Sequence, residues 1–369
     1  MLTVLFVSLL AVILALFSRN DKKALLCAFV ILTAFWALRY NWGNDYMQYL
    51  SHYKSIKSYN MGLFDISGYD QIFVKRDYLW YILNNLFSNF GFFGLIIVLS
   101  LVENFIIYRF VVNYVPPKWY WLSVFIYCFN IEFYLIGASM MRQWLALCLF
   151  VYAINFLLDK RIIPYLIISI IAIFIHFSAI VMLLCIPFAY IKNLKIGNKY
   201  LVLLFGFLLI WYIMAPLYLR DYAYLFYELN DQGAYSNYEM TNMNDKGLSF
   251  FGIISNYFIP LTGFLMLYLN GDLKTKILAS IFILQLIFVP LGSVMPIFGR
   301  ITTYFTSLGI VVWPLVIYEM LKRKYSLISI SILCLLLLIN IRGYIGFFSD
   351  SIWEKSFSTY TTILTQEWQ

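Results

Sequence analysis

The sequence predicts an all-α fold, a polytopic membrane helical bundle of about 12 transmembrane helices that forms a single membrane domain over residues 1–369. Composition is the first reason: 63% of the residues are hydrophobic and 12% are charged, whereas roughly a quarter of the residues in soluble domains are charged. The second reason is that long apolar runs extend from one end of the chain to the other. A soluble multidomain protein, which length alone would suggest, is a poorer interpretation.

The apolar runs define the expected crossings, since a spanning helix needs about 20 mostly apolar residues and shorter ones are tolerated. The first run, Leu2–Phe17, lacks the basic start and the small-residue cleavage site of a signal peptide, so we expect it to be retained as a crossing. The other candidates are residues 24–38, 91–112, 119–136, 140–158, 200–216, 250–269, 277–291, 300–320 and 326–341.

Short basic clusters between these runs predict the orientation, because cytoplasmic loops carry an excess of lysine and arginine. Two such clusters, at 160–161 and 192–199, flank one uncharged run at 162–191. Both ends of that run are therefore expected in the cytoplasm, which requires a hairpin that turns near residues 175–177. Buried re-entrant backbone is permitted at membrane depth. With this hairpin both termini lie outside.

Three hydrophilic segments are then expected on the outer face: the loops 39–77 and 218–249 and the tail 342–369, all rich in Tyr, Asn and Asp. Residues 77–90 have helical apolar spacing and predict an amphipathic helix on the outer surface. Its expected apolar face consists of Leu79, Trp80, Ile82, Leu83, Leu86 and Phe87, with asparagines opposite.

Several classes of function lack support in the sequence. The net charge of +8 lies in short clusters next to apolar runs, which indicates contact with a lipid bilayer and no nucleic-acid partner. All five cysteines lie within apolar runs without CxxC spacing, so neither disulfides nor zinc are expected. There is no P-loop, dinucleotide fingerprint or HExxH motif, and no paired-acid motif for a divalent metal. We therefore expect no cofactor and no metal site.

Ionisable side chains embedded in apolar sequence gather near one level, the outer ends of the expected helices. Such groups are costly in a membrane and usually face its protein interior or a wet cavity. Several of them are arginines, which bind phosphate and pyrophosphate well. The set consists of Arg39, Arg142 with Gln143, His176, Arg300 and Arg342.

Each candidate also has a purely structural interpretation. Arg142 and Arg300 are equally typical of interfacial anchors whose long side chains reach the membrane surface. His176 is either a hydrogen-bonded structural histidine or, in its neutral form, a general base. Asp45 is either a turn residue beside Asn44 or a carboxylate that faces a substrate.

Four local patterns in this order resemble the EpsG family of Wzy-type polysaccharide repeat-unit polymerases. They span most of the chain between residues 39 and 305. The patterns are Arg39-Tyr40-Asn41-Trp42-Gly43-Asn44-Asp45-Tyr46 with Tyr49; Met141-Arg142-Gln143-Trp144-Leu145-Ala146; His176-Phe177-Ser178-Ala179 with an apolar run to Pro187; and Arg300-Ile301 with Tyr304-Phe305.

The resemblance implies a fold like that of GT-C membrane glycosyltransferases and an inverting, metal-independent transfer on the outer face of a bacterial inner membrane. The growing glycan would leave undecaprenyl pyrophosphate and join a new lipid-linked repeat unit. On this interpretation Arg142 and Arg300 bind pyrophosphate with Arg39 in support, Gln143 and Tyr304 orient nearby groups, and the base is His176 or Asp45. A chain-length-regulator protein is a further expected partner.

Two other functions fit some of these sequence features. An O-antigen-ligase-like transferase shares the donor, but ligases typically carry a larger outer loop than residues 218–249. A lipid-linked oligosaccharide flippase or other transporter would place ionisable residues near the midplane, whereas here they favour one face.

Overall fold

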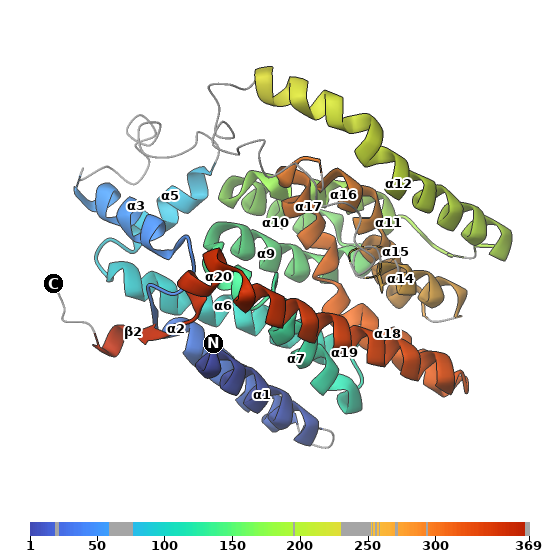
Figure 1. The fold of residues 1–369 in the computed structure, drawn as a ribbon, viewed down its shortest axis with the longest axis horizontal. Helices are drawn as coiled ribbons and strands as arrows, with labels where there is room; N and C mark the ends of the chain where they lie inside the picture. Colours follow the sequence, from blue (N-terminus) through green and yellow to red (C-terminus); the bar gives the residue numbers. More distant parts are fainter. Residues whose placement is uncertain are drawn as a thin grey trace. The chain divides into compact units, whose positions relative to one another are not determined.

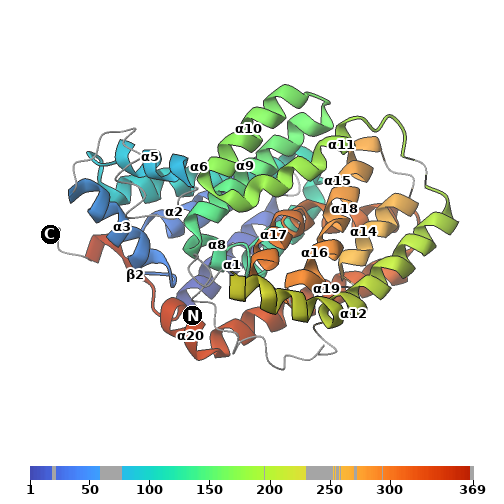
Figure 2. The same cartoon turned by 90° about the horizontal axis from the view of Figure 1, so that it is seen from above.

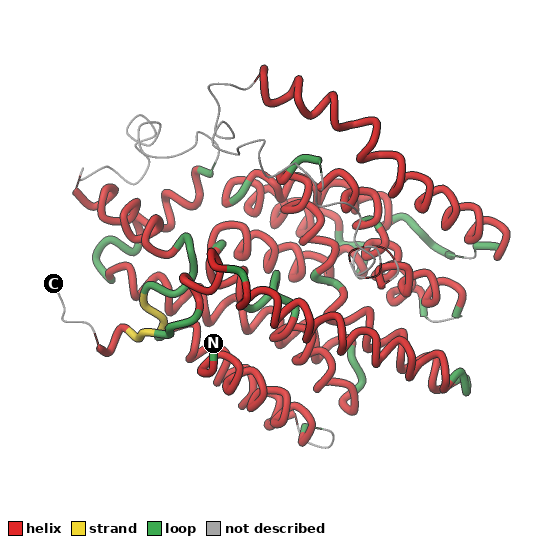
Figure 3. The backbone as a smooth tube through the Cα atoms, in the orientation of Figure 1, coloured by secondary structure: helices red, strands yellow, loops and turns green. Residues whose placement is uncertain are grey.

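The computed structural model describes residues 1–18, 22–58, 77–194, 196–229, 252, 254, 257, 259–269, 272–292 and 294–365. These residues are predominantly helical, so the all-α prediction is confirmed (Figure 1). Within them, β-structure is confined to one antiparallel pair of two-residue strands, β1 (Arg39–Tyr40) and β2 (Thr361–Thr362) (Figure 3). The tertiary contacts divide the chain into two compact units, Met1–Leu183 with Leu337–Gln369, and Leu184–Leu336.

The first unit is a bundle of apolar helices. In it α1 packs against α2 and α7 (Figure 1), and α2 packs against α6, α6 against α9, and α9 against α10 (Figure 2). Small residues recur on the buried side of α1, where Ser8, Ala11 and Ala15 are almost fully buried and allow close approach. The helices are α1 (Leu2–Phe17), α2 (Lys22–Ala37), α3 (Tyr46–Ser58), α5 (Tyr78–Leu86), α6 (Gly91–Tyr114), α7 (Tyr120–Phe129), α8 (Leu135–Ser139), α9 (Met141–Leu158), α10 (Ile162–Ile175) and α20 (Ser351–Phe357).

The core of the first unit is aromatic. Trp36 of α2 is fully buried and stacks on Tyr134, with ring centroids 5.1 Å apart. Tyr134 also donates a hydrogen bond from its hydroxyl to the Leu32 carbonyl at 3.0 Å. This bond anchors the irregular segment between α7 and α8, which interrupts the crossing expected at 119–136. Irregular backbone at this place is compatible with a membrane because protein buries it.

The chain reverses at His176, as the flanking basic clusters predict. α10 ends at Ile175, His176 is extended, and a 3₁₀ segment, η2 (Phe177–Cys185), follows. Tyr165 of α10 donates from its hydroxyl to the carbonyl oxygen of Met182 at 2.6 Å, which is possible only if the two segments lie side by side. α10 has a length of about 21 Å at 1.5 Å per residue, short of a full crossing.

The predicted amphipathic helix at 77–90 forms as α5, but the face that it buries differs from the prediction. The protein covers Trp80, Tyr81 and Asn84, while Leu86 is exposed and Leu79 is only partly covered. Asn84 is satisfied locally, since its side-chain amide donates to the Trp80 carbonyl at 2.7 Å. Trp80 is therefore the one member of the predicted apolar face that is fully buried, and the other members are partly covered or exposed.

The described parts of the expected outer segments are mainly helical. Loop 39–77 contains β1 and α3, and its residues 59–76 lie outside the described part. The tail begins as the last turns of α19 (Ser326–Ser349) and ends with α20, β2 and η5 (Ile363–Thr365). Of the loop expected at 218–249, residues up to Leu229 continue the helix α12 (Asn198–Leu229), and 230–249 lie outside the described residues.

The second unit contains α11 (Ile186–Ala189), α12, α14 (Ile259–Tyr268), α15 (Leu273–Ile283), α16 (Gln285–Gly292), α17 (Pro296–Thr306), α18 (Gly309–Lys322) and the start of α19. α16 packs closely on α17. The reason is the contact between Gly292 and Gly299: a Cβ atom at Gly292 would lie 3.0 Å from the backbone nitrogen of Gly299.

Five stretches among the described residues are long and apolar enough to cross a membrane: Gly91–Tyr114, Met141–Leu158, Asn198–Leu219, Leu273–Gly292 and Ser326–Ser349. The pair Phe298–Thr306 and Gly309–Lys322, bent by 44°, brings the number to six if it forms one span. Leu2–Phe17, Ile162–Ile175 and Phe177–Ala189 are shorter apolar helices. The protein is thus a multi-pass membrane protein, and the total of about twelve crossings stays a prediction.

Candidate functional site

The loop that precedes α3 is fixed by Ser139 at the end of α8. The Ser139 hydroxyl accepts a hydrogen bond from the Asp45 backbone N–H at 3.1 Å and donates one to the Asn44 side-chain oxygen at 2.6 Å. Gly43 has a φ of +105° and a Cβ atom there would lie 2.9 Å from the Ser139 Cβ, so only glycine fits. These contacts place Asp45 directly before the first turn of α3.

Three polar residues of α3 and its start lie on one side of the helix. Asp45, Tyr49 and His52 are four and three residues apart, which is the spacing of neighbours on a helical surface. Tyr49 is 8% exposed and its ring packs edge-on against Trp80 of α5, with centroids 5.5 Å apart. This side of α3 therefore borders the start of α5.

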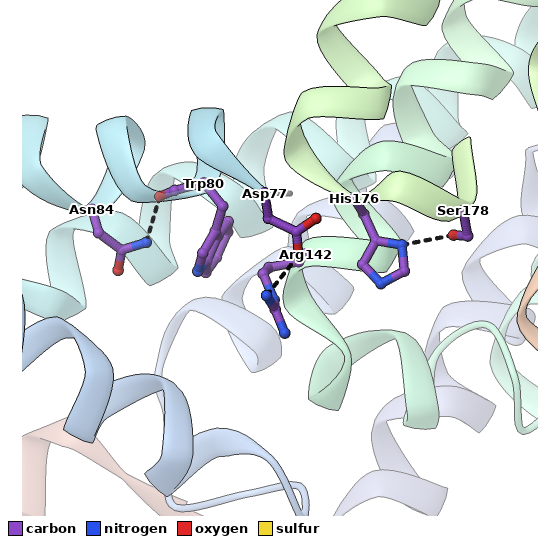
Figure 4. A network of polar contacts seen from close by, with 6 residues as sticks. All are labelled: Asp77, Trp80, Asn84, Arg142, His176 and Ser178. Carbon is purple, nitrogen blue, oxygen red and sulfur yellow. Dashed lines mark hydrogen bonds and ion pairs between the residues drawn. The ribbon is translucent and has the colours of Figure 1, made fainter. Parts of the chain in front are cut away.

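Arg142 joins this cluster from α9. Its Nη1 atom lies 2.7 Å from Oδ2 of Asp77, the residue before α5, and forms an ion pair with it (Figure 4). The Arg142 Cζ atom also lies 5.7 Å from the centroid of the Tyr49 ring, within cation–π range. The side chains of Arg142 and Asp77 are 21% and 10% exposed, so the pair is accessible from one side.

The position of Arg142 favours an anion. It is the second residue of α9, where the helix dipole is positive and where Met140 provides no side-chain cap. A guanidinium group and the first backbone N–H groups of a helix together attract phosphate or carboxylate groups. This end of α9 is therefore suited to bind a negatively charged ligand group.

Burial and the charge of Arg142 shift the pKa values of two α3 residues, Tyr49 and His52. Burial raises the pKa of Tyr49, and the nearby Arg142 charge opposes that rise in part. Burial lowers the pKa of His52, and repulsion from Arg142 lowers it further. At neutral pH both side chains are uncharged, so Arg142 is the positive group that faces this side of α3.

His176 lies next to the same cluster. It caps the C-terminal end of α10, and α10 packs against both α9 and α5. Figure 4 shows its imidazole beside the Arg142–Asp77 pair, with Nδ1 in a 2.6 Å hydrogen bond to the Ser178 hydroxyl. Asp45 belongs to the cluster too, since it interacts electrostatically with Tyr49. The structure thus brings together Arg142, His176 and Asp45 among the predicted site residues.

Arg39 and Gln143 are buried away from this accessible side. Arg39 is 1% exposed and donates hydrogen bonds to the Trp36 carbonyl at 2.6 Å, the Ser100 hydroxyl at 3.2 Å and the Ala138 carbonyl at 3.1 Å. These hydrogen bonds join α2, α6 and α8. The expected role of Arg39, in support of pyrophosphate binding, stays a prediction. Gln143 is 5% exposed.

Arg300 and Tyr304 belong to the second unit, one turn apart on α17. Tyr304 is fully buried and Arg300 is half-buried. Their predicted roles in one site with Arg142 stay a prediction.

Sequence reasoning missed two members of the cluster, His52 and Asp77. The spacing from Asp45 through Tyr49 to His52 was a usable signal for His52, because it places all three on one helix side. No comparable signal identifies Asp77, whose partner lies 65 residues away along the chain. Among the described residues, no group of three or more His, Cys, Asp and Glu side chains is placed to hold a metal ion.

Fold and site together define a multi-pass, all-α membrane protein with an anion-attracting cluster at the ends of four helices. The chain belongs to the EpsG family, whose model matches residues 22–362. It is therefore a membrane protein of a family linked to exopolysaccharide synthesis. No curated protein and no solved structure matches the chain.

Proposed function

We propose that this protein polymerises lipid-linked oligosaccharide repeat units on the outer face of the bacterial inner membrane. In this reaction the growing chain moves from undecaprenyl pyrophosphate to the hydroxyl of a new repeat unit, and the anomeric configuration inverts. The proposal combines two observations: the chain belongs to the EpsG family, and the cluster around Arg142 is suited to bind an anion.

The observation that carries the proposal is the position of Arg142. It stands in the first turn of α9 with a partly exposed guanidinium group, between a carboxylate and an aromatic ring. A pyrophosphate leaving group gains negative charge as the glycosidic bond breaks, and a fixed positive group lowers the energy of that transition state. Arg142 provides such a group, and Arg300 is the second proposed pyrophosphate contact.

The acceptor hydroxyl must lose a proton during the transfer, which requires a base within hydrogen-bond reach. His176 and Asp45, the two candidates from the sequence, both border the Arg142 cluster. The Tyr49 ring lies against the Arg142 guanidinium group, where it can keep that group in place or contact a sugar of the substrate.

The test is the length distribution of the surface glycan in a polymerase-null host. Wild type should restore a ladder of repeat units, whereas Arg142→Ala should leave a single unit with normal amounts of protein in the membrane. Arg300→Ala and His176→Ala should shorten the ladder. Arg323→Ala is the matched control, because Arg323 forms an ion pair with Glu319 of α18 outside the Arg142 cluster.

Other outcomes separate the alternatives. If wild type leaves single units and unlinked repeats accumulate on lipid at the outer face, ligation replaces polymerisation as the best proposal. If repeats accumulate on the inner face without the protein and cross when it is present, the protein is a transporter. A full ladder from Arg142→Ala would refute the role of Arg142.

A further inference from the structure

Asp77 occupies a helix-capping position without acting as a cap. It immediately precedes α5, and aspartate there normally accepts a hydrogen bond from a backbone N–H of the first turn. The Asp77 side chain makes no such bond. Instead, its carboxylate reaches Arg142 on a different helix at 2.7 Å. Asp77 therefore forms the ion pair with Arg142 in place of the capping hydrogen bond.

Arg142 breaks a second local rule. A cation in the first turn of a helix opposes the helix dipole, and arginine is favoured at the other end. Two neighbouring residues that both depart from local preference are typical of a functional site. The Arg142 side chain is 21% exposed, so a ligand group in solution can reach the guanidinium group while Asp77 is bound to it.

The carboxylate of Asp77 stands where a phosphate group of the donor would bind Arg142. Carboxylate and phosphate oxygens both accept hydrogen bonds from the same guanidinium donors. Asp77 and a bound pyrophosphate therefore compete for Arg142. An incoming pyrophosphate would displace the carboxylate and leave it a few ångströms from the reacting atoms.

We propose that Asp77 is the general base of the transfer, held on Arg142 until the donor pyrophosphate displaces it. This inference rests on the polymerase function proposed above. Once displaced, the carboxylate faces the phosphate anion, and a nearby like charge makes it a stronger base. Donor binding thus activates the base.

The step balances with the groups named. The acceptor oxygen forms a bond to the anomeric carbon of the growing chain as the bond from that carbon to the pyrophosphate oxygen breaks. The acceptor proton passes to the Asp77 carboxylate. The electron pair of the broken bond stays on the pyrophosphate, whose added charge Arg142 neutralises. The donor and the acceptor are the only reactants, and no change of oxidation state occurs.

His176 and Asp45 then act as positioning residues beside the reaction. The His176 ring is held by Ser178 at 2.6 Å, and Asp45 is held through its backbone by Ser139. The Asp77 carboxylate is bonded directly to Arg142.

The experiment compares two properties of the full-length protein in lipid nanodiscs and membrane vesicles. The first is affinity for inorganic pyrophosphate, measured by the rise in unfolding temperature with concentration. The second is the initial rate at which lipid-linked units polymerise. The variants are Asp77→Asn, Asp77→Glu and Arg142→Ala. The matched control is Glu319→Gln, which removes the carboxylate of the α18 ion pair.

Asp77→Asn should bind pyrophosphate at least as tightly as wild type, because Arg142 loses its competitor, while the rate falls about 10²- to 10⁴-fold. Asp77→Glu keeps a carboxylate and should recover part of the rate. Arg142→Ala should weaken pyrophosphate binding roughly 10- to 100-fold. Glu319→Gln should change neither property.

A wild-type rate in Asp77→Asn would overturn the inference and leave the polymerase function intact. Equal losses of affinity and rate in Asp77→Asn would also overturn it, because they indicate a structural role. Absence of polymerisation by wild type would instead refute the proposed function itself.

Discussion

The indole N–H of Trp42 donates a hydrogen bond to the carbonyl oxygen of Phe357 at 3.1 Å and joins residues 315 positions apart in the chain. The C-terminal tail thereby holds the loop that leads to Asp45. Two further contacts join the same loop to the C-terminal tail. The Gly43 N–H donates to the Ser356 carbonyl at 3.0 Å, and β2 pairs with β1.

We expect Trp42→Phe to lower the free energy of unfolding by about 1–3 kcal/mol, because a buried carbonyl loses its donor. A phenyl ring keeps part of the packing against Phe35 and Phe357, and the smaller ring leaves a cavity that adds to the loss. Thermal unfolding of the purified protein measures the effect. Trp353→Phe is the control, since that ring stacks on Phe347 in the same tail. Equal effects of both variants would contradict the role of the hydrogen bond.

Two arginines that the sequence places in one functional set should respond to mutation in different ways. Arg39 is buried with three hydrogen-bond partners and is attracted electrostatically by the buried Glu103. Arg39→Met should cost about 2–6 kcal/mol, because the buried carbonyl oxygens of Trp36 and Ala138 both lose their donor. Arg142→Ala should cost less, because the Arg142 side chain is 21% exposed and water can take its place beside Asp77.

The measurement is the amount of folded protein in membranes together with its unfolding temperature. Arg39→Met should lower both. Arg142→Ala should lower neither by much, yet should abolish glycan polymerisation. If Arg39→Met folds normally and loses only activity, Arg39 contacts the substrate and the structural role assigned to it is wrong.

The lowered pKa of His52 predicts that the stability of the folded protein depends on pH. Its pKa in the folded protein is lower than the ordinary value of about 6.5, because of burial and then Arg142. Below about pH 6.5 the unfolded chain therefore binds more protons at this residue than the folded chain does. Stability falls as the pH drops from about 6.5 toward the folded pKa, and the His52 contribution is constant above that window.

His52→Gln removes this titration. The loss of unfolding temperature between pH 7.5 and pH 5.5 should therefore be smaller in His52→Gln than in wild type. Arg142→Ala should also reduce the loss, because it removes the second cause of the low pKa. An unchanged pH dependence in His52→Gln would show that His52 is not the responsible group.

Several elements could be predicted because their signals are local. The end of α1 at Phe17 follows from an apolar run that gives way to polar residues, and the reversal at His176 follows from two basic clusters. The buried face of α5 could not be predicted. Lipid is as apolar as leucine, so hydrophobicity does not distinguish a side that faces lipid from one that faces protein. Trp80 and Asn84 are buried because neighbouring helices cover them.

The candidate site was predictable only in part. An arginine at the end of an apolar run is a candidate site residue, because a charged side chain is costly inside a membrane. Both Arg39 and Arg142 have this position in the sequence. Which of them is buried depends on helices that lie far away in the chain: Ser100 and Ala138 enclose Arg39, while Asp77 faces Arg142. Such pairings are set by tertiary packing.

The position of Arg300 on α17 depends on the close contact between α16 and α17. A Cβ atom at Gly292 would lie 3.0 Å from the nitrogen and 3.2 Å from the Cα atom of Gly299, the residue before Arg300. These are backbone atoms and cannot rotate away, so Gly292→Ala must shift α17. Overpacking of this kind costs about 1–3 kcal/mol.

We expect Gly292→Ala to lower the unfolding temperature and to reduce polymerisation as much as Arg300→Ala does, because it displaces Arg300. Gly206→Ala in α12 is the matched control: no atom lies within 4 Å of a Cβ atom there, and alanine favours a helix by about 1 kcal/mol over glycine. The control should therefore be neutral or slightly stabilising. If Gly292→Ala lowers stability but leaves the glycan ladder unchanged, the position of Arg300 does not matter for the reaction and its proposed role falls.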